Sequence, residues 1–321
     1  MKAFVYETYG SPDVLDLKEV EKPTPKADEV LVKVQAISIN PKDWRLMRGD
    51  PFFTRLITGL FSPKSGILGA DIAGRVEAVG TNVTQFKQGD EVFGDILDGG
   101  FAEYVCATED KFVLKPTTMS PAEAAAVPLA AKTALQGLRD KGQLQAGQRV
   151  LINGASGGIG TFAVQIAKSY RAEVTGVCST RNVEMVYSIG ADHVIDYTQE
   201  NFTPHRQHYD LILDVVGNLS VSDFKHSLAP KGIFVLIGFT TLAHMVKVLL
   251  LGAWITRRSN QKVLAMNEQP NQEDMKILKG LIEDRKIKSV IDRCYPFHEI
   301  PEAIRYLETG RARGKVVITM E

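Results

Sequence analysis

The feature that most constrains how this chain can fold is an alternation of strand-like and helix-like segments that begins near residue 120. Ser120 can cap a helix, with Pro121 at its first position and Glu123 at its third. An apolar run at Arg149–Asn153 is followed by a segment whose apolar residues share one helical face. Further strands are expected at Glu173–Val177, His193–Ile195, Asp210–Val215 and Ile233–Ile237. The pattern predicts an α/β fold with a doubly wound parallel sheet, covered by helices on both faces.

The first 115 residues have a different character, because short β-like runs alternate with glycine and proline turns. These runs are Val30–Ile37, Ala73–Val79 and Glu103–Ala107. They predict a mostly antiparallel β domain, to which the helix-like segment Gln272–Asp284 and the final strand from Lys315 are expected to return. We therefore expect a β domain over residues 1–119, completed by residues 268–321, and an α/β domain over residues 120–267.

Composition excludes several classes of protein. The chain has 321 residues, of which 44% are hydrophobic and 24% charged, which is typical of a globular protein with two domains. Lysine plus arginine equals aspartate plus glutamate, 38 each, so the overall charge predicts no nucleic-acid partner and no attraction to an anionic membrane, although local basic patches stay open. Three scattered cysteines and the absence of an apolar signal-peptide core near Met1 favour the cytoplasm.

A glycine turn connects the strand at Arg149–Asn153 with the helical segment after it. In the run Gly154-Ala155-Ser156-Gly157-Gly158-Ile159-Gly160, the first glycine permits the tight turn and the middle pair permits close approach of a pyrophosphate. The last glycine permits close packing of helix on strand. The helix N-terminus then offers free amide hydrogens and a partial positive charge to the phosphates. The context predicts a Rossmann dinucleotide-binding domain.

The residues that end the second predicted strand indicate which nicotinamide cofactor is bound. An NAD site usually has an aspartate or glutamate there, about 20 residues after the turn, to hold the ribose 2′-hydroxyl. This chain instead has Ser179, Thr180 and Arg181. Hydroxyl groups and a guanidinium suit a 2′-phosphate through charge-assisted hydrogen bonds. We therefore predict NADPH as the cofactor; the alternative is that Arg181 only begins the next helix on a solvated face.

Together these and other motifs resemble the medium-chain dehydrogenase/reductase superfamily, specifically its zinc-free quinone oxidoreductase-like branch. The matching stretches cover nearly the whole chain: Ile39–Trp44, Leu68–Val76, Gly89–Gly94, Gly100–Tyr104, Ala126–Ala134, the glycine turn, Gly190–Asp192 and Gly310–Ile318. The resemblance implies a GroES-like β domain built from both chain ends, a Rossmann domain between, and a homodimer. We expect the dimer contact at the strand-like segment Gln261–Met266.

The resemblance also assigns positions around the cofactor. It implies that Ser179, Arg181 and Tyr197 line the pocket of the 2′-phosphate. It further implies that Asn40, Leu129, Thr133 and the turn Val215-Val216-Gly217 lie on the nicotinamide side, with Lys315 close to the cofactor.

The metal positions of zinc-dependent relatives are not matched. Asn40 stands where those relatives have a cysteine, and Gly69-Ala70-Asp71 stands where they have Gly-His-Glu. We therefore expect no metal site, and the histidine pair His205 and His208 is interpreted as a solvated loop. Without a Lewis acid, alcohol oxidation is not favoured, whereas hydride transfer to a quinone or an α,β-unsaturated carbonyl needs only positioning and hydrogen bonds.

The identity of the acceptor and of the proton donor stays open. No tyrosine lies between Tyr9 and Tyr104, so the candidate polar groups for catalysis are Asn40, Lys42, Arg45 and Thr133. An enoyl-thioester or alkenal double-bond reductase and a non-catalytic NADPH-binding sensor are the alternatives. The apolar residues Trp44, Phe52, Phe53, Leu56, Ile57, Leu60 and Phe61 either line the acceptor site or belong to the core. The stretch Leu242–Ile255 either covers the cleft, contacts a membrane or a subunit, or is a buried helix.

Overall fold

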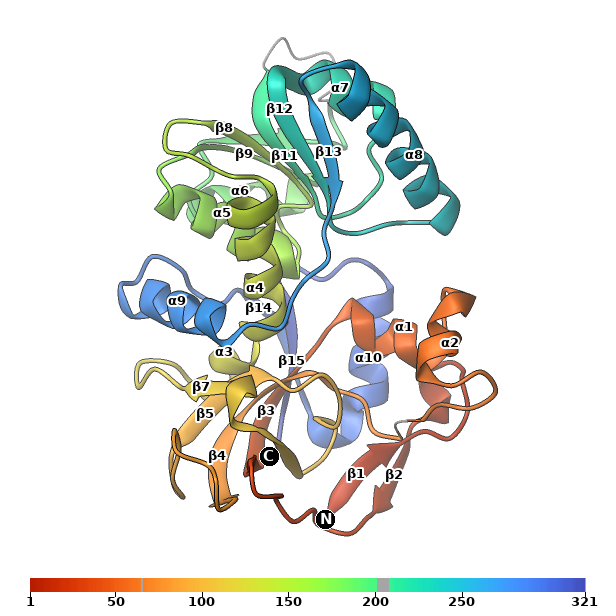
Figure 1. Ribbon diagram of the computed structural model, residues 1–321, viewed down its shortest axis with the longest axis vertical. Helices are drawn as coiled ribbons and strands as arrows, with labels where there is room; N and C mark the ends of the chain where they lie inside the picture. Colours follow the sequence, from red (N-terminus) through yellow and green to blue (C-terminus); the bar gives the residue numbers. More distant parts are fainter. Residues whose placement is uncertain (65, 201–207, 321) are drawn as a thin grey trace. The chain divides into compact units, whose positions relative to one another are not determined.

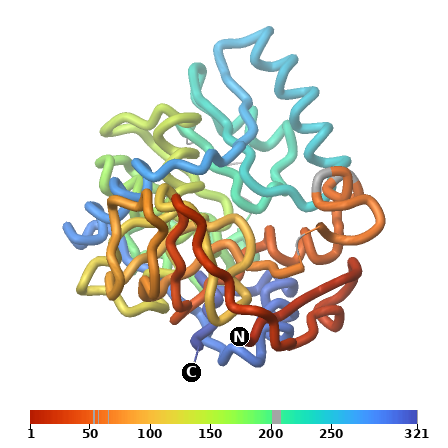
Figure 2. Tube along the Cα trace, turned by 60° about the horizontal axis from the view of Figure 1, so that its bottom comes forward, coloured from red at the N-terminus to blue at the C-terminus, as the bar shows by residue number. Residues whose placement is uncertain are grey.

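The computed structural model describes residues 1–64, 66–200 and 208–320, and it divides them into two compact units. One unit contains residues 1–129, 270–284 and 289–321, and the other contains residues 130–269 and 285–288. The units therefore change at residues 129/130 and 269/270, where the sequence led us to expect domain boundaries at 119/120 and 267/268. Both chain ends lie in the first unit (Figures 1 and 2).

The second unit is built on a six-stranded sheet whose strands are all parallel. Its strands are β8 (Arg149–Asn153), β9 (Glu173–Cys178), β10 (His193–Asp196), β11 (Tyr209–Asp214), β12 (Leu228–Leu236) and β13 (Lys262–Ala265), in the spatial order β10-β9-β8-β11-β12-β13. The chain starts in the middle and winds outward in both directions, which is the doubly wound topology predicted from the sequence. The fold class is therefore confirmed.

Helices connect these strands and pack against the sheet (Figure 1). They are α5 (Gly158–Ser169), α6 (Val183–Ser188), α7 (Val221–Ser227) and α8 (Leu242–Arg258), and α4 (Pro128–Gln136) precedes them and continues into a π-helical turn. Because the two halves wind in opposite directions, right-handed crossovers place their helices on opposite faces of the sheet. The central strand β8 is buried from Val150 to Asn153, and its apolar residues Val150–Ile152 follow one another without alternation.

The first unit contains a second sheet that is mostly antiparallel, as predicted. Its path is β14-β15-β3-β4-β5-β7, with β6 paired to β3, and β1 and β2 form a separate hairpin-like pair. The strands are β1 (Lys2–Val5), β2 (Asp16–Glu19), β3 (Glu29–Ile39), β4 (Asp71–Val79), β5 (Glu91–Asp95), β6 (Tyr104–Thr108), β7 (Phe112–Leu114), β14 (Ile291–Pro296) and β15 (Lys315–Thr319). The helices are α1 (Pro41–Arg48), α2 (Arg55–Thr58), α3 (Pro121–Ala125), α9 (Gln272–Glu283) and α10 (Ile300–Glu308).

Strand pairing brings the two ends of the chain together in this sheet. The last strand β15 lies antiparallel to β3, so that Val316 faces Ile39. On its other side β3 pairs with β4, and Ser38 faces Asp71. Residues that are far apart in the sequence, in β15, at the end of β3 and at the start of β4, therefore meet at one place in the sheet.

Candidate functional site

The glycine turn lies between β8 and α5, and two of its glycines are required by the protein itself. Gly154 has a φ of 87°, which is the left-handed region that side chains avoid. A Cβ at Gly160 would lie 2.0 Å from the carbonyl oxygen of Gly154, so only glycine lets α5 start this close to the turn. These two positions shape the turn whether or not a ligand is bound.

Gly157 differs from both of these, because none of the described residues requires it to be glycine. Its φ is −85°, and a Cβ there would have the Gly154 oxygen at 3.6 Å, an ordinary contact, as its nearest neighbour. Gly157 is also the N-cap of α5, and no side chain caps this end of the helix. The first amide groups of α5 therefore lack a side-chain acceptor, and the space beside Gly157 lets a phosphate approach them. The turn fits a dinucleotide pyrophosphate.

The end of β9 is tied to the glycine turn by a residue that the sequence analysis did not select. The buried side chain of Asn182 donates from Nδ2 to the hydroxyl of Ser156 in the turn, at 3.0 Å, and to the hydroxyl of Ser179, at 3.2 Å. Its Oδ1 has no hydrogen-bond partner among the described residues. Asn182 thus holds two of the expected cofactor positions together. In the sequence, the only signal for this role of Asn182 was an amide side chain directly before a helix.

The expected 2′-phosphate positions lie around this strand end. Ser179 is half-buried, Arg181 is exposed, and Tyr197, just after β10, is 60% exposed. The main chain of Tyr197 donates to the carbonyl of Cys178, which places the residue after β10 beside the end of β9. The three residues thus occupy neighbouring strand ends, and their contact with a 2′-phosphate stays a prediction.

A carboxylate also lies at these strand ends, and the sequence analysis missed it. In the parallel pairing of β9 and β10, Asp196 faces Cys178. Its Oδ1 accepts hydrogen bonds from the amide and the hydroxyl of Thr198, at 3.0 and 2.7 Å. The hydrogen bonds from Thr180 and Thr198 outweigh partial desolvation and lower the pKa of Asp196. The carboxyl group thus stays charged beside the expected 2′-phosphate pocket.

The third part of the cofactor site is the turn after β11. The buried carboxylate of Asp214 accepts from the amide of Gly217, at 2.8 Å, and from Nδ2 of Asn153 at the end of β8, at 2.7 Å. Burial raises the pKa of Asp214, and these donors act in the opposite direction. A Cβ at Gly154 would lie 2.7 Å from Cγ2 of Val216, so the two turns are in contact. β8 and β11 are the strands between which the winding direction changes, the usual position of a ligand in such sheets.

The first unit contains a buried polar cluster of Asn40, Asp71 and Lys315. Nδ2 of Asn40 donates to Oδ2 of Asp71 at 3.0 Å, and Nζ of Lys315 donates to Oδ1 of Asn40 at 2.6 Å. Nζ of Lys315 also lies 3.8 Å from Oδ2 of Asp71, while Oδ1 of Asp71 accepts from the amide of Leu129. All three side chains of the cluster are at most 3% exposed. Burial raises the pKa of Asp71 and lowers that of Lys315, and each charge opposes the shift of the other.

Asp43 joins this cluster through the main chain of Asn40. The amide of Asn40 donates to Oδ2 of Asp43 at 2.7 Å, which fixes the start of α1. The other oxygen, Oδ1, is buried without a partner among the described residues. Burial raises the pKa of Asp43 to about 7. Asn40 is therefore held from both its main chain and its side chain.

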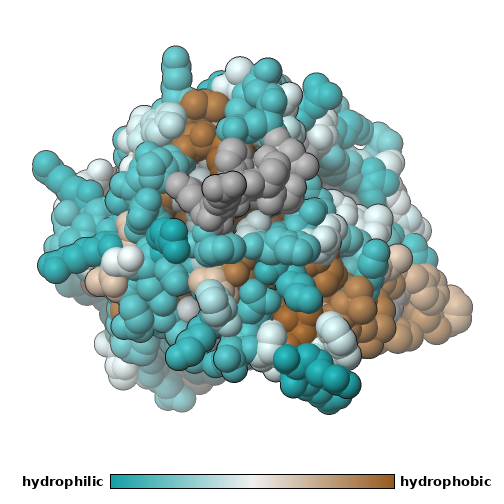
Figure 3. All heavy atoms as spheres, turned by 90° about the horizontal axis from the view of Figure 1, so that it is seen from above, coloured by the Kyte–Doolittle hydropathy of each residue, from teal (hydrophilic) through white to brown (hydrophobic). Residues whose placement is uncertain are grey.

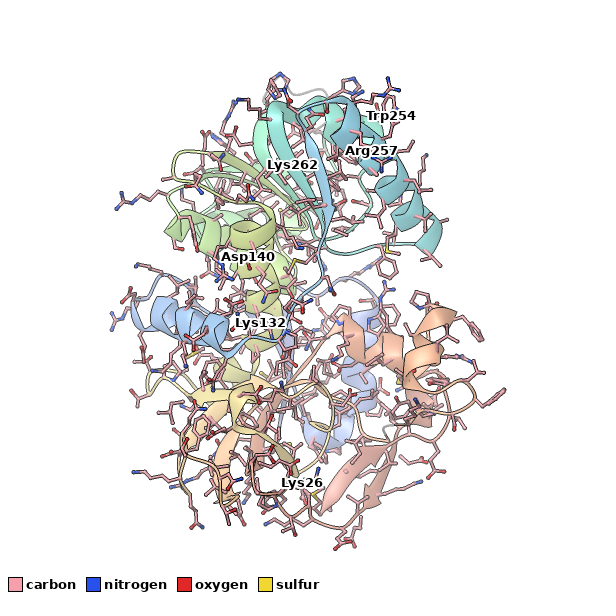
Figure 4. All side chains as sticks on the ribbon, in the orientation of Figure 1. Lys26, Lys132, Asp140, Trp254, Arg257 and Lys262 are labelled. Atoms are coloured by element: carbon pink, nitrogen blue, oxygen red, sulfur yellow. The ribbon has the colours of Figure 1, made fainter. Side chains whose placement is uncertain are left out.

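The other three catalytic candidates do not join the cluster in the same way. Nζ of Lys42 donates to the carbonyl of Leu97 at 3.0 Å, and the guanidinium of Arg45 lies 4.9 Å from the ring of Trp44. Thr133 is buried in α4, in the second unit, next to Lys132, which forms an ion pair with Glu268 at 2.9 Å (Figure 4). Their catalytic roles stay predictions.

The interpretation of the apolar residues after α1 as part of the core is wrong for several of them. Phe52, Leu56, Leu60 and Phe61 are exposed, because the short helix α2 and its flanking turns expose this side of the segment. Trp44 is half-buried and packs against the core of the first unit. The side chains of residues 53 and 57 and the histidine at 205 lie outside the described part of the structure.

Metal-ligating side chains do not cluster within residues 1–64, 66–200 and 208–320. No group of three or more His, Cys, Asp and Glu side chains is arranged there to hold an ion. Both oxygens of Asp71, the last residue of the stretch that stands in place of Gly-His-Glu, already accept hydrogen bonds from the protein.

Comparison with known proteins gives the same class for the whole chain. Residues 26–117 match the alcohol dehydrogenase GroES-like domain, and residues 189–318 match a family described as zinc-binding dehydrogenase. The chain is similar to 2-methylene-furan-3-one reductase of Solanum lycopersicum, with 38% identity over 99% of this chain and 79% of the relative. It is 34% identical to NADPH-dependent alkenal/one oxidoreductase of Arabidopsis thaliana, over 99% of this chain and 79% of the relative. The solved structure of the quinone oxidoreductase from Coxiella burnetii matches with a TM-score of 0.85 and 30% identity, over 100% of this chain and 99% of that one.

Fold, glycine turn and relatives together define an oxidoreductase of the class that binds a nicotinamide dinucleotide. More narrowly, the chain belongs to the quinone oxidoreductase-like branch of the medium-chain dehydrogenase/reductase superfamily.

Proposed function

We propose that this protein is an NADPH-dependent, metal-independent reductase that transfers hydride to a quinone or to the activated double bond of an α,β-unsaturated carbonyl. The observation that carries the proposal is the open, uncapped start of α5 at Gly157, beside strand ends that present Ser179 and Arg181. The names of the relatives, an alkenal/one oxidoreductase, a furanone reductase and a quinone oxidoreductase, support this substrate class.

Each group of residues has a proposed task. The glycine turn would hold the pyrophosphate, and Ser179, Arg181 and Tyr197 would hold the 2′-phosphate, with Asn182 keeping Ser179 and the turn in place. The turn Val215-Val216-Gly217, fixed by Asp214, would bound the nicotinamide end. Bound NADPH supplies the hydride; the protein supplies orientation and donors for the oxyanion.

On the acceptor side we propose Asn40, Lys42, Arg45 and Thr133 as hydrogen-bond donors, with Lys315 and Asp71 as the groups that orient Asn40. Nζ of Lys315 is already engaged with Asn40, so its closeness to the cofactor stays part of the proposal. Asp71 is similarly engaged, which supports chemistry without a metal.

The molecular setting is also part of the proposal. We propose a homodimer that forms at β13, because this strand ends the sheet and pairs only with β12. None of the helices in the described ranges could cross a membrane. We propose the cytoplasm as the compartment, on the basis of composition.

The test is turnover of NADPH, after exhaustive treatment with a chelator, against ortho- and para-quinones, alkenals, enones and enoyl thioesters. We expect turnover with a quinone, enone or alkenal and no stimulation by added zinc. Activity confined to enoyl thioesters would favour the double-bond reductase alternative. Tight NADPH binding without any turnover would favour the sensor, and activity that depends on stoichiometric zinc would refute metal independence.

A further inference from the structure

The helix α8 leaves an apolar stripe exposed on the second unit. Leu242, Val246, Leu250 and Trp254 recur every four residues, so they share one face of the helix. Their side chains are 41%, 44%, 69% and 54% exposed. The opposite face, with Val248, Gly252 and Ile255, is the buried one. Only this side of α8 packs on the sheet, so the interpretation of the stretch as a buried helix is wrong.

Basic side chains surround this stripe. Lys247, Arg257 and Arg258 are exposed on the same helix, and Lys225 and Lys262 are exposed on the neighbouring α7 and β13. Nζ of Lys225 and the guanidinium carbon of Arg258 each lie 6.0 Å from the ring of Trp254. Figure 4 labels Trp254 and Arg257 on α8 and Lys262 on β13. The cations are therefore part of the same surface as the apolar stripe.

This basic character is local, and it is not balanced by acidic residues. The sequence between Asp223 and Glu268 has six lysines and arginines and no aspartate or glutamate, although the whole chain has 38 charges of each sign. Figure 3 views the molecule from above and shows hydrophobic side chains among the hydrophilic ones on this face. An apolar face that is bordered by cations is complementary to a surface that is apolar inside and anionic at its rim.

We propose that α8 docks this protein reversibly on the surface of an anionic lipid membrane. The stripe would enter the boundary between headgroups and acyl chains, with Trp254 at the interface and Lys247, Arg257 and Arg258 against lipid phosphates. The helix lies on such a surface and does not cross it, consistent with its 17 residues. A second copy of the chain fits the stripe less well, because an isologous contact through α8 would place the same cations of both copies against each other.

Vesicle co-sedimentation of the full chain tests this proposal. We expect binding to vesicles of phosphatidylcholine with about 30% phosphatidylglycerol, little binding to phosphatidylcholine alone, and weaker binding as salt rises. Arg257→Gln with Arg258→Gln should lower the partition coefficient about 25-fold, since each cation near an anionic surface contributes about fivefold. Leu250→Gln with Trp254→Ser should lower the partition coefficient at least tenfold. This is about the loss expected when one large apolar side chain is no longer removed from water.

Matched controls use exposed residues outside this region. Lys64→Gln with Lys87→Gln removes the same charge, and Ile277→Gln on α9 replaces an apolar side chain that is 44% exposed. Neither control should change vesicle binding. Thermal unfolding and NADPH turnover check that every variant is folded.

Three results would overturn the proposal. One is an absence of vesicle binding at low salt. Another is equal loss of binding in the control variants. The third is a change from dimer to monomer in Leu250→Gln with Trp254→Ser, measured by sedimentation velocity, while vesicle binding is retained; the stripe would then be a subunit contact.

Discussion

Replacing Gly157 with alanine should separate cofactor binding from folding. The other turn glycines cannot do this, because alanine at Gly154 would require a φ of 87° and alanine at Gly160 would collide with the main chain. Gly157 has an ordinary φ, and a Cβ added there would lie 3.6 Å from the nearest atom, the carbonyl oxygen of Gly154. The methyl group would therefore fit the protein alone but would occupy the space through which a phosphate reaches the start of α5.

The two energies can be worked out separately for this substitution. Alanine instead of glycine restricts the unfolded chain and adds about 0.4–1 kcal/mol of stability. Alanine is a poorer N-cap than glycine, which costs a similar amount of about 0.5–1 kcal/mol. The free energy of unfolding should thus change by less than about 0.5 kcal/mol. Losing one charge-assisted hydrogen bond to phosphate costs about 1.5–3 kcal/mol, so the Kd for NADPH should rise about 10- to 100-fold.

Fluorescence titration with NADPH and urea unfolding of the same samples measure both quantities. Gly280→Ala in the exposed side of α9 is the matched control, because nothing lies within 4 Å of its added Cβ. It should stabilise the protein by about 0.5–1 kcal/mol and leave NADPH binding unchanged. Gly160→Ala should lose stability as well as affinity. If Gly157→Ala binds NADPH as tightly as the original protein, the main chain of the turn does not hold the pyrophosphate.

Three other predictions test other parts of the site. Arg181→Ala should raise the Kd for NADPH about tenfold and leave the Kd for NADH unchanged, as measured by calorimetric titration. An equal loss of affinity for both cofactors would contradict the proposed 2′-phosphate contact. Asp43 has its pKa raised by burial to about 7, against about 4 when unfolded, so the folded state holds its proton more tightly. The free energy of unfolding should therefore fall by a few kcal/mol as pH rises from 4 to 7, and urea unfolding should show a smaller fall in Asp43→Asn. The same dependence on pH in both proteins would refute the raised pKa of Asp43. Lys315→Met leaves the buried carboxylate of Asp71 without its cation and should cost about 3–5 kcal/mol of unfolding free energy. Adding Asp71→Asn should recover most of this loss, and a double variant as unstable as the single one would show that the charge is not the cause.

Local sequence signals predicted those parts of the fold that local chemistry determines. β8 has the predicted bounds, and the Ser120 hydroxyl accepts from the amide of Glu123 at the start of α3, as the capping pattern indicated. β12 was predicted to begin at Ile233 but begins at Leu228, because its first residues, including Pro230, lack the apolar run used for prediction. Its continuous apolar part was found, and its first five residues were not.

The site depends on strand register, and a single sequence contains little information on register. Asn40 and Lys315 are 275 residues apart, and they meet only because β15 pairs with β3 so that Val316 faces Ile39. Likewise, Asp196 reaches the end of β9 through its pairing opposite Cys178. Motifs therefore identified single residues such as Asn40, but not the hydrogen bonds that orient them.

The cluster in the first unit also explains how the protein's own groups stabilise the buried carboxylate of Asp71. Asp71 ends the Gly69-Ala70-Asp71 stretch, which stands where the resemblance implies Gly-His-Glu in zinc-dependent relatives. Here the carboxylate is still buried, and burial of an uncompensated charge is costly. The chain supplies the compensating cation itself, as the ammonium group of Lys315, and the amides of Leu129 and Asn40 satisfy the carboxylate oxygens. Because this cation belongs to the final strand, the orientation of Asn40 depends on the pairing of β15 with β3. Substitutions in this pairing should therefore affect Asn40 before they affect the sheet as a whole.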